Sequence, residues 1–252
     1  MEVQGCVAIV TGANRGIGEG FVHVLIEQGA AKVYAAARDP ASAQHLVDQY
    51  PGKVFAVRLD VLKPDQIVEA AAACPDVSVL VNNAGVSTGK CLIGADDMSA
   101  MREEMEVNYF GPVAMSRAFA PVLKANGGGA ILNVLSVAGI VAVPNMGGYS
   151  PSKFAMRAAG SCIRAELAGQ GTSVTSLIVG SVDTRMASHV KGSKEAPEDI
   201  ARAAMKGITR GVDEIDTDRF AIESRAALAR DPKGMERGMA KMLHAKELST
   251  GR

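Results

Sequence analysis

Tryptophan is absent from this 252-residue chain, and tyrosine and phenylalanine together supply only 4% of it. An excess of one charge is also missing, because 27 Lys and Arg residues balance 27 Asp and Glu residues. A chain without net charge lacks the attraction that draws basic proteins to nucleic acid or to an anionic membrane, so we expect neither partner. Any phosphate that the chain binds must be held by local geometry.

Cysteine and histidine are scarce, with four residues of each. No two cysteines form a C-x-x-C pair, and their apolar surroundings predict buried, reduced thiols in a cytoplasmic protein. The histidines lack metal-ligand spacing, so no metal site is expected. No apolar run is as long as a membrane span, and the first residues do not have the pattern of a signal peptide. The residues concerned are Cys6, Cys74, Cys91, Cys162, His23, His45, His189 and His244.

Hydrophobic residues make up 48% of the chain, in short runs that alternate with longer amphipathic stretches. The short runs are apolar throughout and rich in β-branched residues, as is typical of parallel strands covered on both faces. The pattern predicts an α/β fold with one doubly wound parallel sheet and right-handed crossovers. The expected strands are 6–10, 32–37, 54–59, 77–81, 130–135 and 173–179, and the expected helices are about 16–29, 41–49, 64–73, 98–125 and 152–169.

The C-terminal third departs from this alternation. Residues from about 183 to 212 are polar, and helical patterning resumes only near Glu198, so we interpret this segment as a substrate lid followed by a helix. An ordinary surface loop is the alternative. A charged, helix-prone segment follows at about 218–246, with a break at Asp231-Pro232. No repeat or low-complexity linker divides the chain, so we expect residues 1–252 to form a single domain.

A glycine-rich turn follows the first strand, with the sequence Thr11-Gly12-Ala13-Asn14-Arg15-Gly16-Ile17-Gly18. Gly12 permits a tight turn, while Gly16 and Gly18 let the backbone approach a pyrophosphate and let the helix pack on the strand. The N–H groups and the dipole at the helix start attract phosphates. The spacing is G-x-x-x-G-x-G instead of G-x-G-x-x-G, and such loops also serve as plain turns. Its position between a strand and a helix favours dinucleotide binding.

The end of the second strand indicates which dinucleotide binds. NAD sites place an acidic residue there, whereas this chain has Ala37 followed by Arg38. A guanidinium binds a 2′-phosphate through charge-assisted hydrogen bonds, and Arg15 can reach the same phosphate. We therefore expect NADP(H) in preference to NAD(H). The alternatives are that Arg38 is only a solvated surface charge, or that Asp39 turns toward the ribose.

The third and fourth strands also end in residues suited to a cofactor. Asp60 can accept a hydrogen bond from the adenine amino group, with Val61 beside the ring, although Asp60 can equally cap the next helix. The fourth strand ends in Asn82-Asn83-Ala84-Gly85. Small residues at this point let a cofactor lie against the backbone, and the amides can join neighbouring loops by hydrogen bonds.

Tyr149 and Lys153 stand four residues apart at the start of a predicted helix and therefore share a face. A nearby ammonium stabilises phenolate, so we expect it to lower the pKa of Tyr149. Tyr149 then serves as general acid for carbonyl reduction and as base for alcohol oxidation. Ser136, which ends the fifth strand, can donate to the substrate oxygen. Asn108 can hold a water that relays protons from Lys153. Each residue alone has an ordinary structural explanation, but their order along the strand ends favours catalysis.

These motifs resemble the classical short-chain dehydrogenase/reductase family over roughly residues 5–185. The resemblance depends on T-G-x-x-x-G-I-G at 11–18, N-N-A-G at 82–85, Asn108, Ser136 and Y-x-x-x-K at 149–153. It implies a single-domain Rossmann fold whose seven-stranded parallel sheet has the order 3-2-1-4-5-6-7. It also implies a catalytic tetrad of Asn108, Ser136, Tyr149 and Lys153. A homodimer or homotetramer formed through the helices at about 98–125 and 152–169 is implied as well.

One departure from the family pattern follows the sixth strand. Val179 stands where the family usually has proline, although Gly180 and Thr184 are retained. The loop is therefore expected to be less rigid at the nicotinamide. The expected cofactor site comprises Gly12, Asn14, Arg15, Gly16, Ile17, Gly18, Arg38, Asp60, Val61, Asn83, Ala84, Gly85, Tyr149, Lys153, Gly180, Val182 and Thr184.

The expected substrate site consists of residues that flank the reactive groups: Ser136, Ala138, Val143, Asn145, Met146, Ser181 and Met186. Most are apolar, which predicts a neutral, hydrophobic ketone or alcohol as the small-molecule substrate. The sequence therefore predicts an NADP(H)-dependent oxidoreductase that moves a hydride between nicotinamide and a ketone, an aldehyde or a secondary alcohol. A non-catalytic NADP(H)-binding sensor or scaffold is the alternative, but a sensor needs neither Tyr149 nor Lys153.

Overall fold

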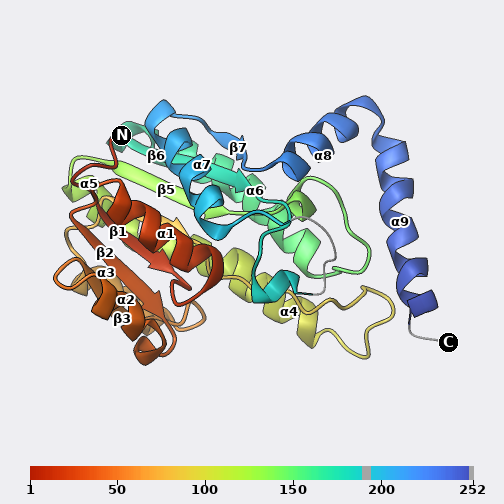
Figure 1. The fold of residues 1–252 in the computed structure, drawn as a ribbon, viewed down its shortest axis with the longest axis horizontal. Helices are drawn as coiled ribbons and strands as arrows, with labels where there is room; N and C mark the ends of the chain where they lie inside the picture. The colour runs from red at the N-terminus through yellow and green to blue at the C-terminus, as the bar shows by residue number, and fades with distance from the viewer. Residues whose placement is uncertain (189–193, 250–252) are drawn as a thin grey trace.

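The described part of this computed structural model comprises residues 1–188 and 194–249. These residues form a parallel sheet of seven strands between two layers of helices, in the order β3-β2-β1-β4-β5-β6-β7 (Figure 1). The α/β fold class and the strand order are therefore confirmed. The strands are β1 (Val7–Thr11), β2 (Lys32–Ala37), β3 (Val54–Arg58), β4 (Val79–Asn82), β5 (Gly129–Val134), β6 (Thr172–Ile178) and β7 (Glu214–Asp216).

The first six strands lie within two residues of their expected positions. The seventh, β7, has no counterpart in the hydrophobic pattern, because it consists of three half-buried residues, two of them acidic. It pairs with β6 from Ser176 opposite Glu214 to Ile178 opposite Asp216. Tertiary pairing at the sheet edge, and not local propensity, therefore makes this segment a strand.

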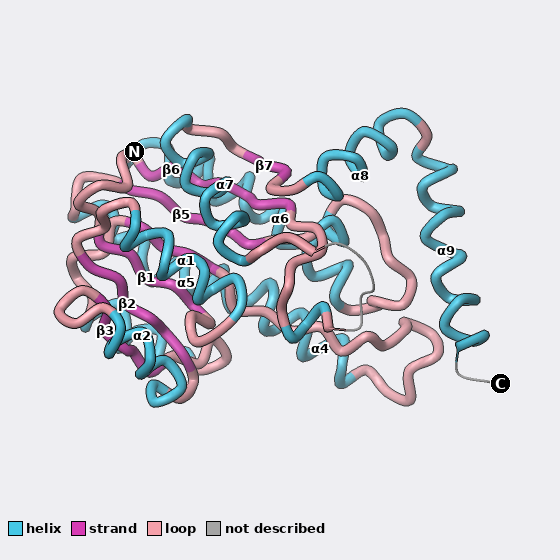
Figure 2. The backbone as a smooth tube through the Cα atoms, viewed as in Figure 1, coloured by secondary structure: helices cyan, strands magenta, loops and turns pink. Residues whose placement is uncertain are grey.

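The helices separate onto the two faces of the sheet (Figure 2). On one face, α1 buries Phe21 and Leu25 in a core shared with α7, while on the other α5 buries Met115 and Phe119 beside α3. Strands covered on both sides account for the continuous apolar runs in the sequence. The helices are α1 (Gly16–Glu27), α2 (Gln44–Gln49), α3 (Pro64–Ala73), α4 (Ser99–Met105), α5 (Gly111–Ala125), α6 (Tyr149–Leu167), α7 (Pro197–Arg210), α8 (Arg219–Arg230) and α9 (Pro232–Ser249).

Helix α7 begins at Pro197, close to the expected start near Glu198, and confirms the helix predicted in the second half of the segment 183–212. Ile200 and Met205 of α7 are buried in the core, and a Cβ atom at Gly20 of α1 would overlap the backbone of Pro197. A helix packed this closely on α1 is part of the core. Residues 183–196 remain as the candidate lid, of which 189–193 lie outside the described residues. The described ends of this segment pair with each other through a hydrogen bond from Asp183 N to Glu195 O, 2.9 Å long.

The single helix expected at about 98–125 is interrupted in its middle. A π-helical segment, Glu106–Phe110, separates α4 from α5 and contains Asn108. Pro112 lacks an N–H group, so it cannot donate to the carbonyl of Asn108 four residues earlier, as a regular α-helix would require. The proline therefore explains why the helix changes its hydrogen-bonding pattern at this candidate site residue.

The C-terminal segment forms two helices that meet at the predicted break. Helix α8 ends at Arg230 and α9 begins at Pro232, which confirms the interruption at Asp231-Pro232. Figure 1 shows α9 on the side of the molecule where the strands of the sheet end. Met239 of α9 packs against a buried cluster that contains Tyr149. None of the described helices combines the length with the apolar composition needed to cross a membrane.

Candidate active site

The turn between β1 and α1 has the backbone shape that the glycine pattern predicts. Gly12 and Gly16 have φ angles of 64° and 57°, in the left-handed region that favours glycine. A Cβ atom at Gly18 would overlap the carbonyl oxygen of Gly12, so only glycine lets the helix start lie this close to the turn. Arg15 is the N-cap residue of α1, and its side chain makes no capping hydrogen bond to the first N–H groups of the helix. This geometry suits a pyrophosphate.

Thr11 joins this turn to the loop that follows β4. Its hydroxyl accepts hydrogen bonds from the backbone N–H groups of Asn83 (2.9 Å) and Ala84 (3.0 Å), and the Asn83 side chain donates to the Thr11 carbonyl at 2.8 Å. A Cβ atom at Gly16 would lie 3.1 Å from the Thr184 methyl carbon, so the loop after β6 reaches the same turn. Three loops expected to form the cofactor site thus meet. Thr11 is the first residue of the glycine motif, but the motif alone does not predict that Thr11 joins the two loops.

Arg15 and Arg38 are both exposed beside this turn. Neither guanidinium makes a hydrogen bond or an ion pair with any residue in 1–188 or 194–249. The carboxylate of Asp39, by contrast, accepts from the Ala41 N–H at 3.1 Å and caps the short helix that follows. Two uncommitted guanidinium groups near a phosphate turn fit a 2′-phosphate, and the capping role of Asp39 argues against the alternative that Asp39 binds the ribose.

Asp60 and Val61 lie where β3 ends. Asp60 Oδ1 accepts from the Leu62 N–H at 3.0 Å, which is a local turn. The N-cap of α3 is Lys63, so the alternative that Asp60 caps this helix is wrong. Val61 packs against Gly111 at the start of α5, where a Cβ atom would lie 3.0 Å from it.

The four residues of the expected tetrad converge beside Gly85. A Cβ atom at Gly85 would lie 3.1 Å from Asn108 Oδ1 and 3.6 Å from Lys153 Nζ. Lys153 Nζ donates to the Val134 carbonyl at 2.9 Å and lies 5.5 Å from the centre of the Tyr149 ring. The Ser136 side chain acts on the Tyr149 phenol and belongs to the same group. Residues from the loop after β5, from α6 and from the π-helical segment are thereby brought together.

The pKa values of Tyr149 and Lys153 are both changed by burial, and the pKa of Tyr149 changes in the direction opposite to the expected one. Burial raises the pKa of Tyr149; the hydrogen bond from Ser136 opposes this change, and the charge of Glu104 adds to it. Burial lowers the pKa of Lys153 to about 8. The expected lowering of the Tyr149 pKa is therefore wrong, because burial of the phenol outweighs the influences that favour phenolate. Tyr149 therefore stays protonated at neutral pH, as a general acid must.

Asn108 is almost fully buried, with 1% of its surface exposed. Its Oδ1 atom accepts from the Val86 N–H at 2.9 Å, and its Nδ2 atom donates to the Val86 carbonyl at 2.9 Å and to Ser152 Oγ at 3.1 Å. The side chain therefore clamps the loop after β4, with both hydrogens of Nδ2 donated to Val86 and Ser152. The relay water expected at Asn108 stays a prediction.

The residues expected to bind substrate do not all lie together. Ala138, Val143 and Tyr149 form one buried cluster, with Met146 and Met239 packed against it. Val143 and Met146 also line an apolar pocket of about 380 Å³ that extends to Leu92 and Phe154, and no tetrad residue lines this pocket. Of the remaining residues, Ser181 and Asn145 are half-buried and Met186 is exposed. Val182, expected to contact cofactor, is buried in the core, so its side chain faces away from the site.

The loop after β6 is held despite the absence of the usual proline. Val179 is buried and its carbonyl accepts from the Val137 N–H at 2.9 Å, while the Gly180 N–H donates to Asp218 Oδ2 at 2.6 Å. Asp218 also caps α8 by accepting from the Ala221 N–H at 2.9 Å. These contacts replace the rigidity expected from proline, and Asp218 gave no signal in the sequence beyond its position before a helix.

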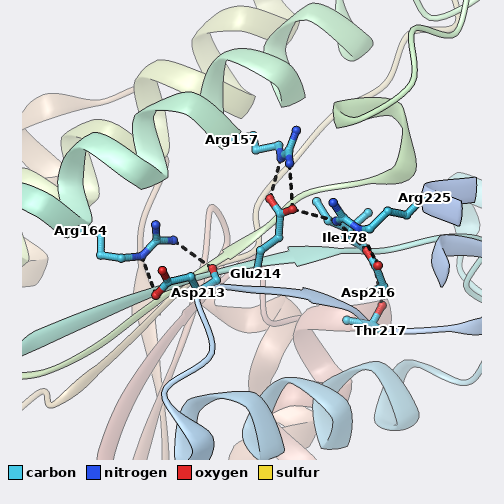
Figure 3. Close-up of polar contacts among 8 residues, drawn as sticks. All are labelled: Arg157, Arg164, Ile178, Asp213, Glu214, Asp216, Thr217 and Arg225. Atoms are coloured by element: carbon cyan, nitrogen blue, oxygen red, sulfur yellow. Dashed lines mark hydrogen bonds and ion pairs between the residues drawn. The ribbon is translucent and has the colours of Figure 1, made fainter. Parts of the chain in front are cut away.

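Helix α6, which carries Tyr149 and Lys153, is fastened to the sheet edge by ion pairs (Figure 3). The Arg157 guanidinium donates to both carboxylate oxygens of Glu214 in β7, at 2.6 and 2.9 Å. Arg225 of α8 lies 2.8 Å from the same carboxylate. Although burial opposes ionisation, these two guanidinium groups hold the pKa of Glu214 below its usual value. The polar sequence of β7 thus serves to fix α6.

Arg157→Ala is expected to lower the free energy of unfolding by about 1–2 kcal/mol, because it removes a bidentate charged hydrogen bond from a half-buried carboxylate. Since the pKa of Glu214 is depressed in the folded state, this contribution is present above the usual carboxylate pKa and is lost as pH falls through the depressed value. Urea unfolding at neutral and acid pH measures both effects. The control is Arg219→Ala, whose pair with Glu223 is exposed; an equal loss in both variants would contradict the prediction.

The glycine turn at the edge of a parallel sheet, together with the buried Tyr149, Lys153 and Asn108 and the half-buried Ser136, is typical of nucleotide-dependent oxidoreductases. The family model described as short chain dehydrogenase matches residues 6–195. The chain belongs to the short-chain dehydrogenase/reductase family. It is 31% identical over 234 residues to dehydrogenase/reductase SDR family member 7B of Danio rerio, across 82% of this chain and 75% of that protein.

Two solved structures share this architecture. A short chain dehydrogenase from Burkholderia cenocepacia J2315, in complex with NADP, is 40% identical with a TM-score of 0.89, and the match covers 95% of this chain and 99% of that one. A 7 alpha-hydroxysteroid dehydrogenase, complexed with NADH and 7-oxo glycochenodeoxycholic acid, is 28% identical with a TM-score of 0.78, covering 85% of this chain and 92% of that one. Family membership makes this protein an oxidoreductase that uses a nucleotide cofactor.

Proposed function

We propose that the protein is an NADP(H)-dependent carbonyl reductase for a neutral, hydrophobic ketone or aldehyde. The observation that carries this proposal is the group of Tyr149, Ser136 and Lys153, in which Tyr149 and Lys153 are buried and burial keeps the phenol protonated. A protonated acid is needed when hydride adds to a carbonyl, because the oxygen that gains negative charge must take up a proton. A sensor or scaffold has no use for such a group.

The residues divide the reaction between them. When bound, the reduced nicotinamide supplies the hydride, which adds to the carbonyl carbon. Tyr149 gives its phenolic proton to the carbonyl oxygen, and Ser136 donates a hydrogen bond to that oxygen as charge builds on it. Lys153 has a pKa of about 8, so its side chain is mostly an ammonium at neutral pH. This charge stabilises the resulting phenolate until solvent returns the proton. One ketone, one hydride and one proton thus yield one alcohol.

The preference for NADP(H) is supported by Arg15 and Arg38, which are free to bind a 2′-phosphate, and by the NADP found in the Burkholderia cenocepacia structure. The residues proposed to hold the dinucleotide backbone are those of the glycine turn, with Asn83, Ala84 and Thr184 beside it. The preference for an apolar substrate is supported by the cluster of Ala138, Val143 and Tyr149 with its two methionines.

We also propose an oligomer and a reducing compartment. Helix α6 exposes Ala158, Ser161 and Ala165 on its outer face, and such small residues permit close contact with a helix of a second copy. All four cysteines are free, and burial raises the pKa of Cys6 and of Cys74 to about 11. The expectation of buried thiols is wrong for Cys91, which is half-buried, and for Cys162, which is exposed at the surface of α6. Free thiols suit the cytoplasm.

A panel of ketones tests the proposal. We expect NADPH oxidation with bulky neutral ketones, a slower reaction with NADH, and little reaction with anionic keto acids, because Tyr149 shares a cluster with the apolar side chains of Ala138, Val143, Met146 and Met239. Absorbance of the reduced cofactor measures the rate, and isothermal titration with NADPH measures binding separately. Binding without turnover across the panel would instead support a sensor, and activity confined to keto acids would contradict the substrate class.

A further inference from the structure

Glu104 is a fully buried carboxylate that the proposed reaction does not use. Its side chain is 0% exposed at the end of α4, four residues before Asn108. Oε1 accepts hydrogen bonds from the N–H of Thr88 at 2.6 Å and from its hydroxyl at 3.0 Å. Oε2 has no hydrogen-bond partner within the described chain. Retaining a buried, half-satisfied carboxylate is costly, and such a cost calls for a function.

Glu104 and Asn108 act on the same loop. Asn108 holds Val86 by two hydrogen bonds, and Glu104 holds Thr88, two residues further along. This loop continues from Gly85, beside which Lys153 Nζ lies. Glu104 and Asn108 together therefore fix the wall of the site opposite α6. The i, i+4 spacing of the two residues is the sequence signal that points to this pair.

The unpartnered oxygen of Glu104 faces the start of α6. A Cβ atom at Gly148 would collide with Glu104 Oε2, so the carboxylate lies against the N-cap residue of the helix that begins with Tyr149. Gly148 has no side chain with which to cap the helix. The positive end of the helix dipole favours a negative charge at this point, which explains how the carboxylate is tolerated. The same dipole would otherwise favour a phenolate at Tyr149, the first residue of the helix.

We propose that Glu104 is a positioning residue that bonds the loop after β4 through Oε1, lies against the start of α6 through Oε2, and there favours the protonated, carbonyl-reducing form of Tyr149. Three polar groups act on the phenol among the described residues: Glu104 from α4, Ser136 after β5, and Lys153 from α6 over the ring. The charge of Glu104 opposes ionisation of the phenol and offsets the effect of the helix dipole. Burial is the largest cause of the raised pKa of Tyr149, and the charge of Glu104 adds to it.

The inference rests on the proposed function only for its kinetic consequence, so its test has a second readout. Glu104→Gln removes the charge and keeps a carbonyl oxygen for Thr88, whereas Glu104→Asp keeps the charge and shortens the reach to Thr88. Glu103→Gln is the matched control, because Glu103 is the exposed neighbour on the same helix. In each protein, the tyrosinate absorbance of the free chain is titrated against a Tyr149→Phe blank. The pH profile of alcohol oxidation is recorded alongside it.

We expect Glu104→Gln to shift the Tyr149 titration and the oxidation profile to lower pH by roughly one unit, as removal of a like charge does. Glu104→Asp should leave both positions unchanged and raise the KM for NADPH, while Glu103→Gln should match wild type. An unshifted tyrosinate titration in Glu104→Gln, or an equal shift in Glu104→Asp, overturns the inference. Wild-type protein without any carbonyl activity would overturn the proposed function instead, and the absorbance titration would still decide the role of Glu104.

Discussion

Tyr149→Phe is expected to reduce kcat for ketone reduction by about 10²- to 10⁴-fold, the range attributed to a positioned general acid. The substitution removes only the phenolic hydroxyl, and the ring still fills its place against Ala138 and Val143. Cofactor affinity and thermal stability should therefore stay close to those of the parent protein. Steady-state kinetics, NADPH titration and a melting curve together measure the three quantities.

The matched control for this substitution is Tyr109→Phe. Tyr109 lies in the π-helical segment beside Asn108 and is half-buried, so it loses the same hydroxyl without touching the reacting group. We expect its kcat to equal that of wild type. If Tyr149→Phe were as active as Tyr109→Phe while still saturable with NADPH, Tyr149 would not be the proton donor.

Arg38→Ala is expected to raise the KM for NADPH about ten- to hundredfold and to leave the KM for NADH nearly unchanged. The loss corresponds to one or two charge-assisted hydrogen bonds to a 2′-phosphate that only NADPH carries. Arg38 makes no ion pair with other described residues, so its removal breaks no internal contact and should not destabilise the fold. Kinetics with both cofactors measure the change in preference.

Arg117→Ala provides the control, because Arg117 is an exposed arginine on α5 and removes the same charge elsewhere on the surface. A proportional rise in both KM values for Arg38→Ala would show that Arg38 shapes the adenosine site in general. An unchanged preference would remove the argument for NADP(H) from Arg38 and leave it to Arg15.

Local patterns predicted most of the sheet, since strands buried on both faces are apolar without interruption. The glycine turn was also predictable, because positive φ angles at Gly12 and Gly16 require glycine. Strand β7 could not be found this way, because its acidic residues have low strand propensity. Glu214 pairs with Arg157 and Asp216 pairs with Arg225, and neither contact can be seen in the local sequence. The π-helical break at Asn108 could have been anticipated from Pro112, four residues beyond it. A proline at that spacing always removes one helical donor.

Predictions about ionisation were less successful, because they depend on what surrounds a group in three dimensions. The spacing of Tyr149 and Lys153 correctly places them together, but it does not reveal that Lys153 bonds the Val134 carbonyl or that Glu104 approaches from α4. The helix expected from about Glu198 is α7, but the pattern did not show that Ile200 and Met205 join the main core.

The last helix has a consequence for how this protein can change. Met235 and Met239 reach the interior clusters from α9, more than two hundred residues along the chain from the glycine turn. None of the residues proposed to hold the dinucleotide or move the proton lies in that helix. New substrate preferences can thus evolve, or be selected in a library, by rewriting a terminal segment while the parts that exchange hydride and proton are inherited intact.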